Sequence, residues 1–103
     1  MTAKIASTDE LDLKQLLRTL VAVKKGDFSV RMPVEQTGIA GKIADALNEI
    51  IELNQNMTTE FKRIGTVVGK EGKIAQRASI GVTNGAWGDC IGSINDLITD
   101  VLQ

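Results

Sequence analysis

Residues 38–68 have the sequence GIAGKIADALNEIIELNQNMTTEFKRIGTVV. In alternating steps of four and three from Ile39, every position except Glu60 is apolar: Ile39, Ile43, Ala46, Ile50, Leu53, Met57, Glu60, Ile64 and Val67. Apolar residues at an average spacing of 3.5 predict a long helix that packs as a coiled coil. At 1.5 Å per residue it would be about 45 Å long. Since a 103-residue globule cannot bury so long a seam, we expect a second chain to cover it.

A shorter helix is predicted before it, over residues 9–25. Ser7 and Glu10 have the spacing of a capping box at its start. Its apolar stripe consists of Leu13, Leu16, Leu17, Leu20 and Val23. Lys24 and Lys25 suit the negative end of the helix dipole, and Gly26 is placed as a left-handed C-cap.

An extended connector is predicted over residues 26–37. Apolar side chains alternate along it at Phe28, Val30, Met32 and Val34, and Pro33 prevents a helix. The neighbouring sequence offers no partner strand. We therefore expect the connector to lie on a helical surface and to press its alternate side chains into that surface.

The same plan then recurs. Residues 23–31 match residues 69–77 at an offset of 46, and residues 43–51 match residues 90–98 at an offset of 47. Such a period marks a repeated unit of helix, connector and helix. We predict a first unit over 9–56, with its second helix starting at 38. The second unit, over 57–103, has its first helix ending near 68, a connector over 69–84, and a last helix over 85–103 that Asn84 can cap.

The composition of the chain argues against several classes of function. Twelve basic and thirteen acidic residues give a net charge of −1, which does not suit a nucleic-acid or anionic-lipid surface. The chain has no histidine and a single cysteine, Cys90. No nucleophile–base pair or metal cluster can be assembled, so we expect no enzyme activity, no catalytic, cofactor-binding or metal-binding residues, and no cofactor. The absence of a signal peptide and of a long apolar run predicts a cytoplasmic chain without a membrane span.

The repeated unit resembles the HAMP domain over residues 10–103. The resemblance is clearest in Gly26-Asp27-Phe28-Ser29-Val30-Arg31-Met32-Pro33 and in Leu47-Asn48. Residues 24–31, 37–39 and 68–73 are further similar to the tandem HAMP arrays of soluble, osmosensing-type hybrid histidine kinases. The second helices begin with Thr37-Gly38 and Asn84-Gly85, where the family usually has Asp-Glu, so the role of that glutamate is not carried over.

The resemblance implies an all-α fold in which two chains form a parallel homodimeric four-helix bundle in each unit. It also implies a non-catalytic relay of a two-component signalling system, whose partners are a second copy of the chain and adjacent HAMP or histidine kinase domains. Such a relay needs two packings that differ by a few kcal/mol. We expect the small residues Ala46 and Ser93, near the two second-helix seams, to permit both.

The sequence leaves two other functions open. Gly69-Lys70-Glu71-Gly72-Lys73-Ile74 is similar to the Gly-x-x-Gly loop with which KH domains clamp nucleic acid, although a helix stop with two glycines explains it better. A passive coiled-coil dimerisation spacer would share the predicted fold.

Several single residues have alternative roles. Cys90 matches Ile43, so burial on the seam is favoured over a redox role. Asn48 and Asn95 recur and either pair across the bundle or bind the connector backbone. The spacing of Asp45, Glu49 and Glu52 predicts a solvated helix face. Trp87 is expected to pack over the second connector, and Arg31 and Arg77 either bind carboxylates on the adjacent helix or are solvated.

Overall fold

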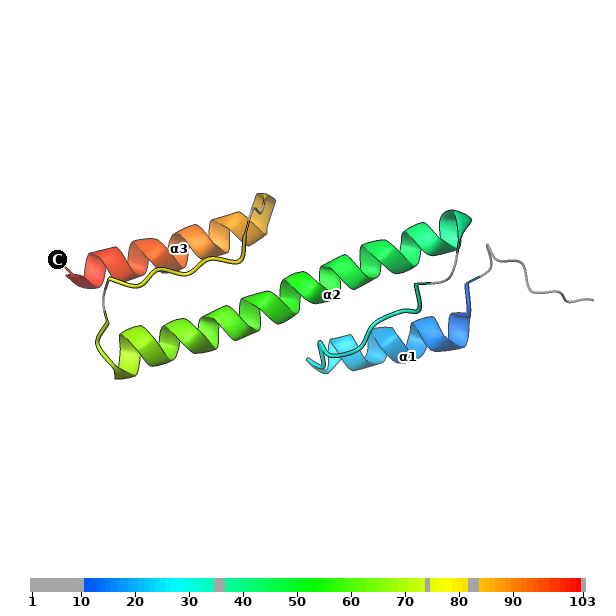
Figure 1. The fold of residues 1–103 in the computed structure, drawn as a ribbon, viewed down its shortest axis with the longest axis horizontal. Helices are drawn as coiled ribbons and strands as arrows, with labels where there is room; N and C mark the ends of the chain where they lie inside the picture. Colours follow the sequence, from blue (N-terminus) through cyan, green and yellow to red (C-terminus); the bar gives the residue numbers. More distant parts are fainter. Residues whose placement is uncertain (1–10, 35–36, 74, 82–83, 103) are drawn as a thin grey trace, which may run out of the picture. The chain divides into compact units, whose positions relative to one another are not determined.

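The computed structural model describes residues 11–34, 37–73, 75–81 and 84–102. Its elements are the α-helices α1 (Leu13–Lys24), α2 (Gly38–Ile64) and α3 (Gly85–Leu102), with the π-helix η1 (Gly65–Lys70) directly after α2 (Figure 1). These described ranges contain no strand, which confirms the all-α prediction. The chain divides into two compact units, Met1–Gln55 and Asn56–Gln103. Helix α2 therefore contributes residues to both.

Each unit pairs two helices that run in the same direction. In unit 1 the chain leaves the end of α1 and returns as an extended connector to the start of α2; in unit 2 it leaves η1 and returns to the start of α3 (Figure 1). A returning connector is what allows consecutive helices to be parallel, because a short turn would make them antiparallel.

Helix α1 begins later than predicted. Its N-cap is Asp12, whose Oδ1 accepts hydrogen bonds from the backbone N–H groups of Lys14 (3.0 Å) and Gln15 (3.1 Å). The predicted start near residue 9 is wrong, because these bonds satisfy the free donors of the first turn at residue 12. The proposed Ser7–Glu10 capping box lies outside the described residues. The predicted left-handed glycine at the helix end is confirmed: Gly26, directly after the C-cap Lys25, has φ 91°, in the left-handed region that glycine adopts without strain.

The first connector presses alternate side chains inward for part of its length. Phe28 and Val30 are half-buried and Met32 is only 2% exposed, as the alternating pattern predicts. Val34 is 75% exposed, so the prediction is wrong for it. Val34 lies two residues beyond Met32, where α2 holds the connector backbone, as described below.

The residues of the predicted seam on α2 differ in solvent exposure between the two units. In unit 1 the buried face contains Ala40, Ala44 and Ile51, each one residue after a seam position, while Ile39, Ile43, Ala46 and Ile50 are exposed. In unit 2 the seam residues Met57 and Ile64 are buried. The reason is that α2 is the second helix of unit 1 and the first helix of unit 2, and each role buries a different set of positions.

The core of unit 2 takes one buried residue from each of its parts: Ile64 of α2, Ala78 of the connector and Ile98 of α3. Half-buried aliphatic side chains surround them, namely Val67, Val68, Ile91 and Ile94. Each helix in the ranges given above is too short or too polar to span a lipid bilayer.

Candidate functional site

The first connector is held on α2 by the side-chain amide of Asn48. The Met32 N–H donates to Asn48 Oδ1 at 2.7 Å, and Asn48 Nδ2 donates to the Met32 carbonyl at 3.0 Å. Met32 is buried in an extended segment that has no neighbouring strand, so its backbone groups need partners from elsewhere. A primary amide supplies one donor and one acceptor side by side, as a neighbouring strand would.

Asn95 repeats this arrangement in unit 2. The Ala78 N–H donates to Asn95 Oδ1 at 2.7 Å, and Asn95 Nδ2 donates to the Ala78 carbonyl at 3.1 Å. Of the two roles left open for the asparagines, binding of the connector backbone is the one observed. We call these two pairs, Asn48 with Met32 and Asn95 with Ala78, the asparagine clamps.

In each connector, the residue directly before the clamped one is an arginine. Arg31 donates to the carbonyls of Phe28 and Val30 and to Gln55 Oε1 of α2, at 2.7, 2.7 and 2.8 Å. The side-chain oxygen that it reaches on α2 thus belongs to an amide rather than to the carboxylate expected as one alternative. Arg77 reaches the Thr99 hydroxyl of α3 at 3.2 Å.

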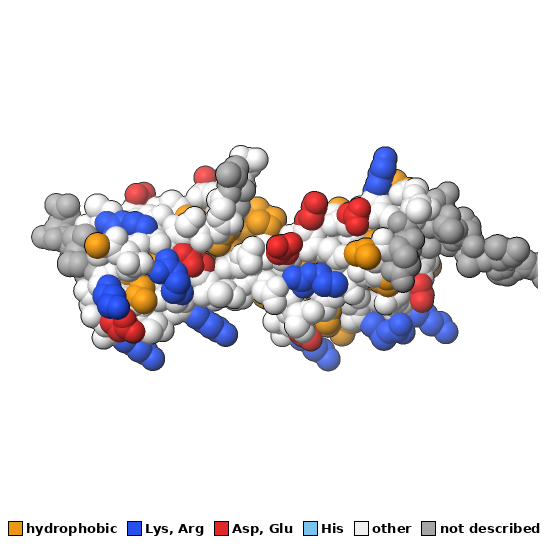
Figure 2. Space-filling view, in the orientation of Figure 1, with side chains coloured by type: hydrophobic (Ala, Val, Ile, Leu, Met, Phe, Trp, Pro, Cys, Tyr) orange, Lys and Arg blue, Asp and Glu red, His pale blue; other side chains and the backbone are white. Residues whose placement is uncertain are grey.

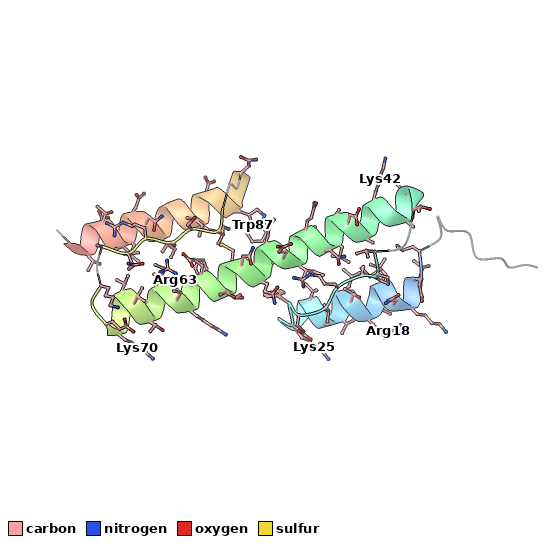
Figure 3. The ribbon with its side chains drawn as sticks, in the orientation of Figure 1. Arg18, Lys25, Lys42, Arg63, Lys70 and Trp87 are labelled. Atoms are coloured by element: carbon pink, nitrogen blue, oxygen red, sulfur yellow. The ribbon has the colours of Figure 1, made fainter. Side chains whose placement is uncertain are left out.

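Unit 2 has a further polar contact, between α2 and its connector. Arg63 binds the Glu60 carboxylate through two nitrogens, at 2.9 and 2.8 Å, and points from α2 toward the connector (Figure 3). It also donates to the Arg77 carbonyl (2.8 Å) and to the Gln76 side-chain oxygen (2.9 Å). The Ser79 N–H donates to Glu60 Oε2 at 2.7 Å. We call Glu60, Arg63 and their connector partners the acidic clamp.

The acidic clamp favours the charged forms of both side chains. The hydrogen bonds from Arg63 lower the pKa of Glu60 below the ordinary value of a glutamate, and the Ser79 N–H acts in the same direction, while burial of the carboxyl opposes both. The hydrogen bond to Glu60 raises the pKa of Arg63. The Glu60 side chain is 13% exposed, so its charge is well shielded from water. At neutral pH the clamp is therefore a fully ionised pair.

Among the described residues of unit 1 the acidic clamp has no counterpart. It was not predicted from the sequence. One signal was present: Glu60 is the single charged residue in an otherwise apolar seam, and Arg63 follows it by one helical turn. The position of Ser79 could not be anticipated, because it lies 19 residues away in an irregular segment.

Most other residues singled out by sequence lie at the surface. Cys90, Ala46 and Ser93 are exposed in the single chain. Burial of Cys90 on a seam that a second copy would cover stays a prediction. Asp45, Glu49 and Glu52 are exposed, as predicted for a solvated face. The described residues contain no group of three or more Cys, Asp or Glu side chains arranged to hold a metal ion. Trp87 is half-buried, and its packing over the connector stays a prediction.

The Gly-x-x-Gly segment ends a helix. Gly69 lies within η1, and Gly72 follows the C-cap Glu71 with φ 71°. Together with the lack of strands in the described ranges, this geometry gives no support to a KH-type loop.

Unit 2 contains an apolar groove of about 300 Å³ between α2, η1 and α3. Its walls include Phe61, Val68, Leu97 and Val101, and its floor includes the core residues Ile64 and Ile98. Protein interiors are closely packed, so side chains of the same chain would normally fill such a groove.

Comparison with models of known protein families gave no match for this chain, and no solved structure matches it.

The asparagine clamps give the first prediction. Asn48→Ala should lower the free energy of unfolding by about 1–3 kcal/mol, because it leaves the buried N–H and carbonyl of Met32 unsatisfied. Urea denaturation followed by circular dichroism measures the change. Asn54→Ala is the matched control, since the Asn54 amide binds only an exposed helix carbonyl, that of Ile50. We expect a change below about 0.5 kcal/mol for it; equal losses in the two variants would contradict the clamp.

The acidic clamp predicts a pH dependence. Because the folded pKa of Glu60 is depressed, its contribution to stability is present above the unfolded pKa and is lost as the pH falls through the lower, folded pKa. Glu60→Gln should be less stable than the parent by about 1–3 kcal/mol at neutral pH. The two stabilities should converge in acid, as measured by urea denaturation across pH.

Glu71→Gln is the control, because Glu71 pairs with Lys73 at an exposed site, at 3.2 Å. Exposed pairs contribute little, so this variant should follow the parent at every pH. A Glu60→Gln curve that stays parallel to that of the parent into acid would contradict the assignment.

Proposed function

We propose that this chain is a non-catalytic signal relay that works as a parallel homodimer. In each unit, two parallel helices from each copy form a four-helix bundle. The bundle passes a conformational change along its helices to a downstream output domain such as a histidine kinase. The resemblance to HAMP domains supports the class of function, and the exposed apolar stripes of the helices support the assembly.

The observation on which the proposal chiefly depends is that large aliphatic side chains are exposed at coiled-coil spacing on helices of both units. Leu13, Leu17 and Leu20 of α1 are 71, 62 and 45% exposed. On α2, Ile39, Ile43 and Ile50 are 65, 42 and 49% exposed, and on α3, Leu97 and Val101 are 59 and 69% exposed. We call these residues the open stripes. Apolar side chains reach the surface in both units on the face that Figure 2 shows.

The open stripes are too regular to be scattered surface residues. Single exposed aliphatics are normal in soluble proteins, but steps of three and four place these on one face of each helix. Full burial of one such side chain contributes about 1.5–3 kcal/mol, and a symmetric dimer counts each residue twice. The stripes therefore offer enough free energy to offset the cost of association.

The connectors cannot cover these stripes, because the asparagine clamps hold them on other positions. In unit 1, Asn48 binds the connector backbone, and the nearby residues Ala44 and Ile51 are buried within the unit. A second copy supplies a surface with the same spacing. We propose a parallel alignment of the two copies, which would continue the arrangement inside each unit, whose two helices run in one direction (Figure 1).

A relay also needs a packing that can change. Ala46 lies between Ile43 and Ile50 on the open stripe of α2, and Ser93 occupies the matching place on α3. Small side chains leave room for two rotational settings of the facing helices, whereas large ones would select one. A neighbouring domain that favours one setting would then shift the population of the other.

Cys90 provides a test of the assembly. The chain should have twice its 11.1 kDa mass by light scattering. A short bis-maleimide should join two copies through Cys90, because a parallel dimer places the same residue of both chains at one level. Leu17→Glu should weaken the dimer by at least about tenfold, since it buries a charge on the stripe.

The control moves the thiol to the polar face of the same helix, in a Cys90→Ser, Asp96→Cys variant. This variant should keep the mass of the dimer and cross-link poorly. A monomer, or a dimer that fails to cross-link through Cys90, would contradict the proposed assembly.

The relay itself is tested by Ala46→Leu in a fusion of the chain to a dimeric histidine kinase core. The larger side chain should select one packing and hold autophosphorylation at one level, either high or low. Asp45→Ala, on the solvated face, is the control and should leave kinase activity unchanged. A passive spacer predicts unchanged activity for both variants, so that outcome in a folded Ala46→Leu dimer would reject the relay.

A further inference from the structure

The π-helix η1 is the clearest difference between the two units. It occupies Gly65–Lys70, where α2 leads into the second connector, whereas α1 stays α-helical up to Lys24. π-helical turns are rare, and they occur mostly as short bulges within α-helices, frequently at functional sites.

The last buried position before η1 corresponds to the buried position of α1 at an offset of 45. Thr19 is the buried residue of α1, at 6% exposed, and Ile64 lies 45 residues later at 7% exposed. After η1 the offset is 46, because the C-caps Lys25 and Glu71 correspond, as do the positive-φ glycines Gly26 and Gly72. One additional residue is therefore present between Ile64 and the cap of unit 2.

The hydrogen bonds at the two caps show where this residue is accommodated. In unit 1 the Asp27 N–H donates to the Ala22 carbonyl, five residues back, at 2.9 Å. The corresponding bond in unit 2 joins the Lys73 N–H to the Val67 carbonyl, six residues back, at 2.7 Å. Both bonds close the last helical turn. The turn in unit 2 is one residue larger.

A one-residue insertion in a regular α-helix would turn everything after it by about 100°. The cap at Gly72 and the connector would then face away from the core. A wider π turn accommodates the additional residue while Ile64 and Gly72 keep the environments of their unit 1 counterparts. The segment's own glycines, Gly65 and Gly69, have no atom within 4 Å of a built Cβ and no positive φ. Neither sterics nor backbone conformation therefore requires glycine there, and glycine weakens an α-helix.

We infer that the segment Gly65–Lys70 contains a one-residue insertion, which it accommodates as a π turn. We further infer that the segment is a register switch between α2 and the second connector. In the alternative state the segment is α-helical and the residues after it advance by one position. The acidic clamp spans this segment, with Glu60 before it and Ser79 after it, at 2.7 Å. The clamp thus stabilises the π form, and an advance of one residue breaks it.

The inference depends on neither a dimer nor signalling. Deletion of Gly69 from the 103-residue chain tests it. The deletion should convert the segment to α-helix without loss of fold. Hydrogen-bond scalar couplings in NMR should show the amide of Lys73 bonded five residues back, as Asp27 is in unit 1. The thermal midpoint should stay the same or rise. Amide exchange over Gly65–Lys70 should slow by about tenfold, because the exchange between registers is removed.

Two controls accompany the deletion. Gly69→Ala removes the glycine but keeps the length, so it should retain the six-residue bond of Lys73. Deletion of Ala22 from α1, which holds no additional residue, should lower the thermal midpoint by more than about 5 °C. The inference is overturned if the Gly69 deletion destabilises the chain as much as the Ala22 deletion. It is also overturned if amide exchange in the segment is as slow in the parent as in the deletion variant.

Discussion

The structure depends on how an extended connector can lie on a helix without leaving its backbone unsatisfied. A lone extended segment has no ladder partner, and a buried peptide group without a hydrogen bond costs about 1–3 kcal/mol. Asn48 and Asn95 meet this constraint by offering both a donor and an acceptor to a single residue, Met32 or Ala78. Each unit has one such contact at its centre. The connector can return along the helices because of it, and the helices are parallel as a result.

The clamps also determine which helix faces remain open. In unit 1, Ala40, Ala44 and Ile51 of α2 are buried, and the aliphatic positions one residue earlier stay exposed. The apolar residues of α2 thus form two sets, one buried inside the unit and one exposed at its surface. In the proposed relay, the first set would keep each unit intact while the packing of the second set against another copy would change.

The two units differ in how firmly the connector is tied to the first helix. In unit 2, Glu60 and Arg63 bind the connector backbone from α2, and the π turn of η1 lies between those contacts. Unit 1 has no such charged pair on α1 within the described residues. Its connector begins instead with a local turn, in which the Asp27 carboxylate accepts from the Ser29 N–H and hydroxyl, and these bonds lower the pKa of Asp27. The start of the connector is therefore held by a local turn in unit 1, and in unit 2 the connector is bound to the first helix by charged side chains; in both units an asparagine clamp holds the connector on the second helix.

The sequence by itself determined the helices, the left-handed glycine at Gly26 and the repeat, because apolar periodicity and the signals that end a helix are local properties of the sequence. It also narrowed the asparagines to two roles. Only the tertiary structure decided between those roles and brought Glu60 to Ser79. It also placed a π-helix at Gly65–Lys70 in unit 2. These outcomes depend on which face of each helix a connector covers. That choice is made by contacts between residues far apart in the chain, which a pattern of spacings along the sequence does not specify.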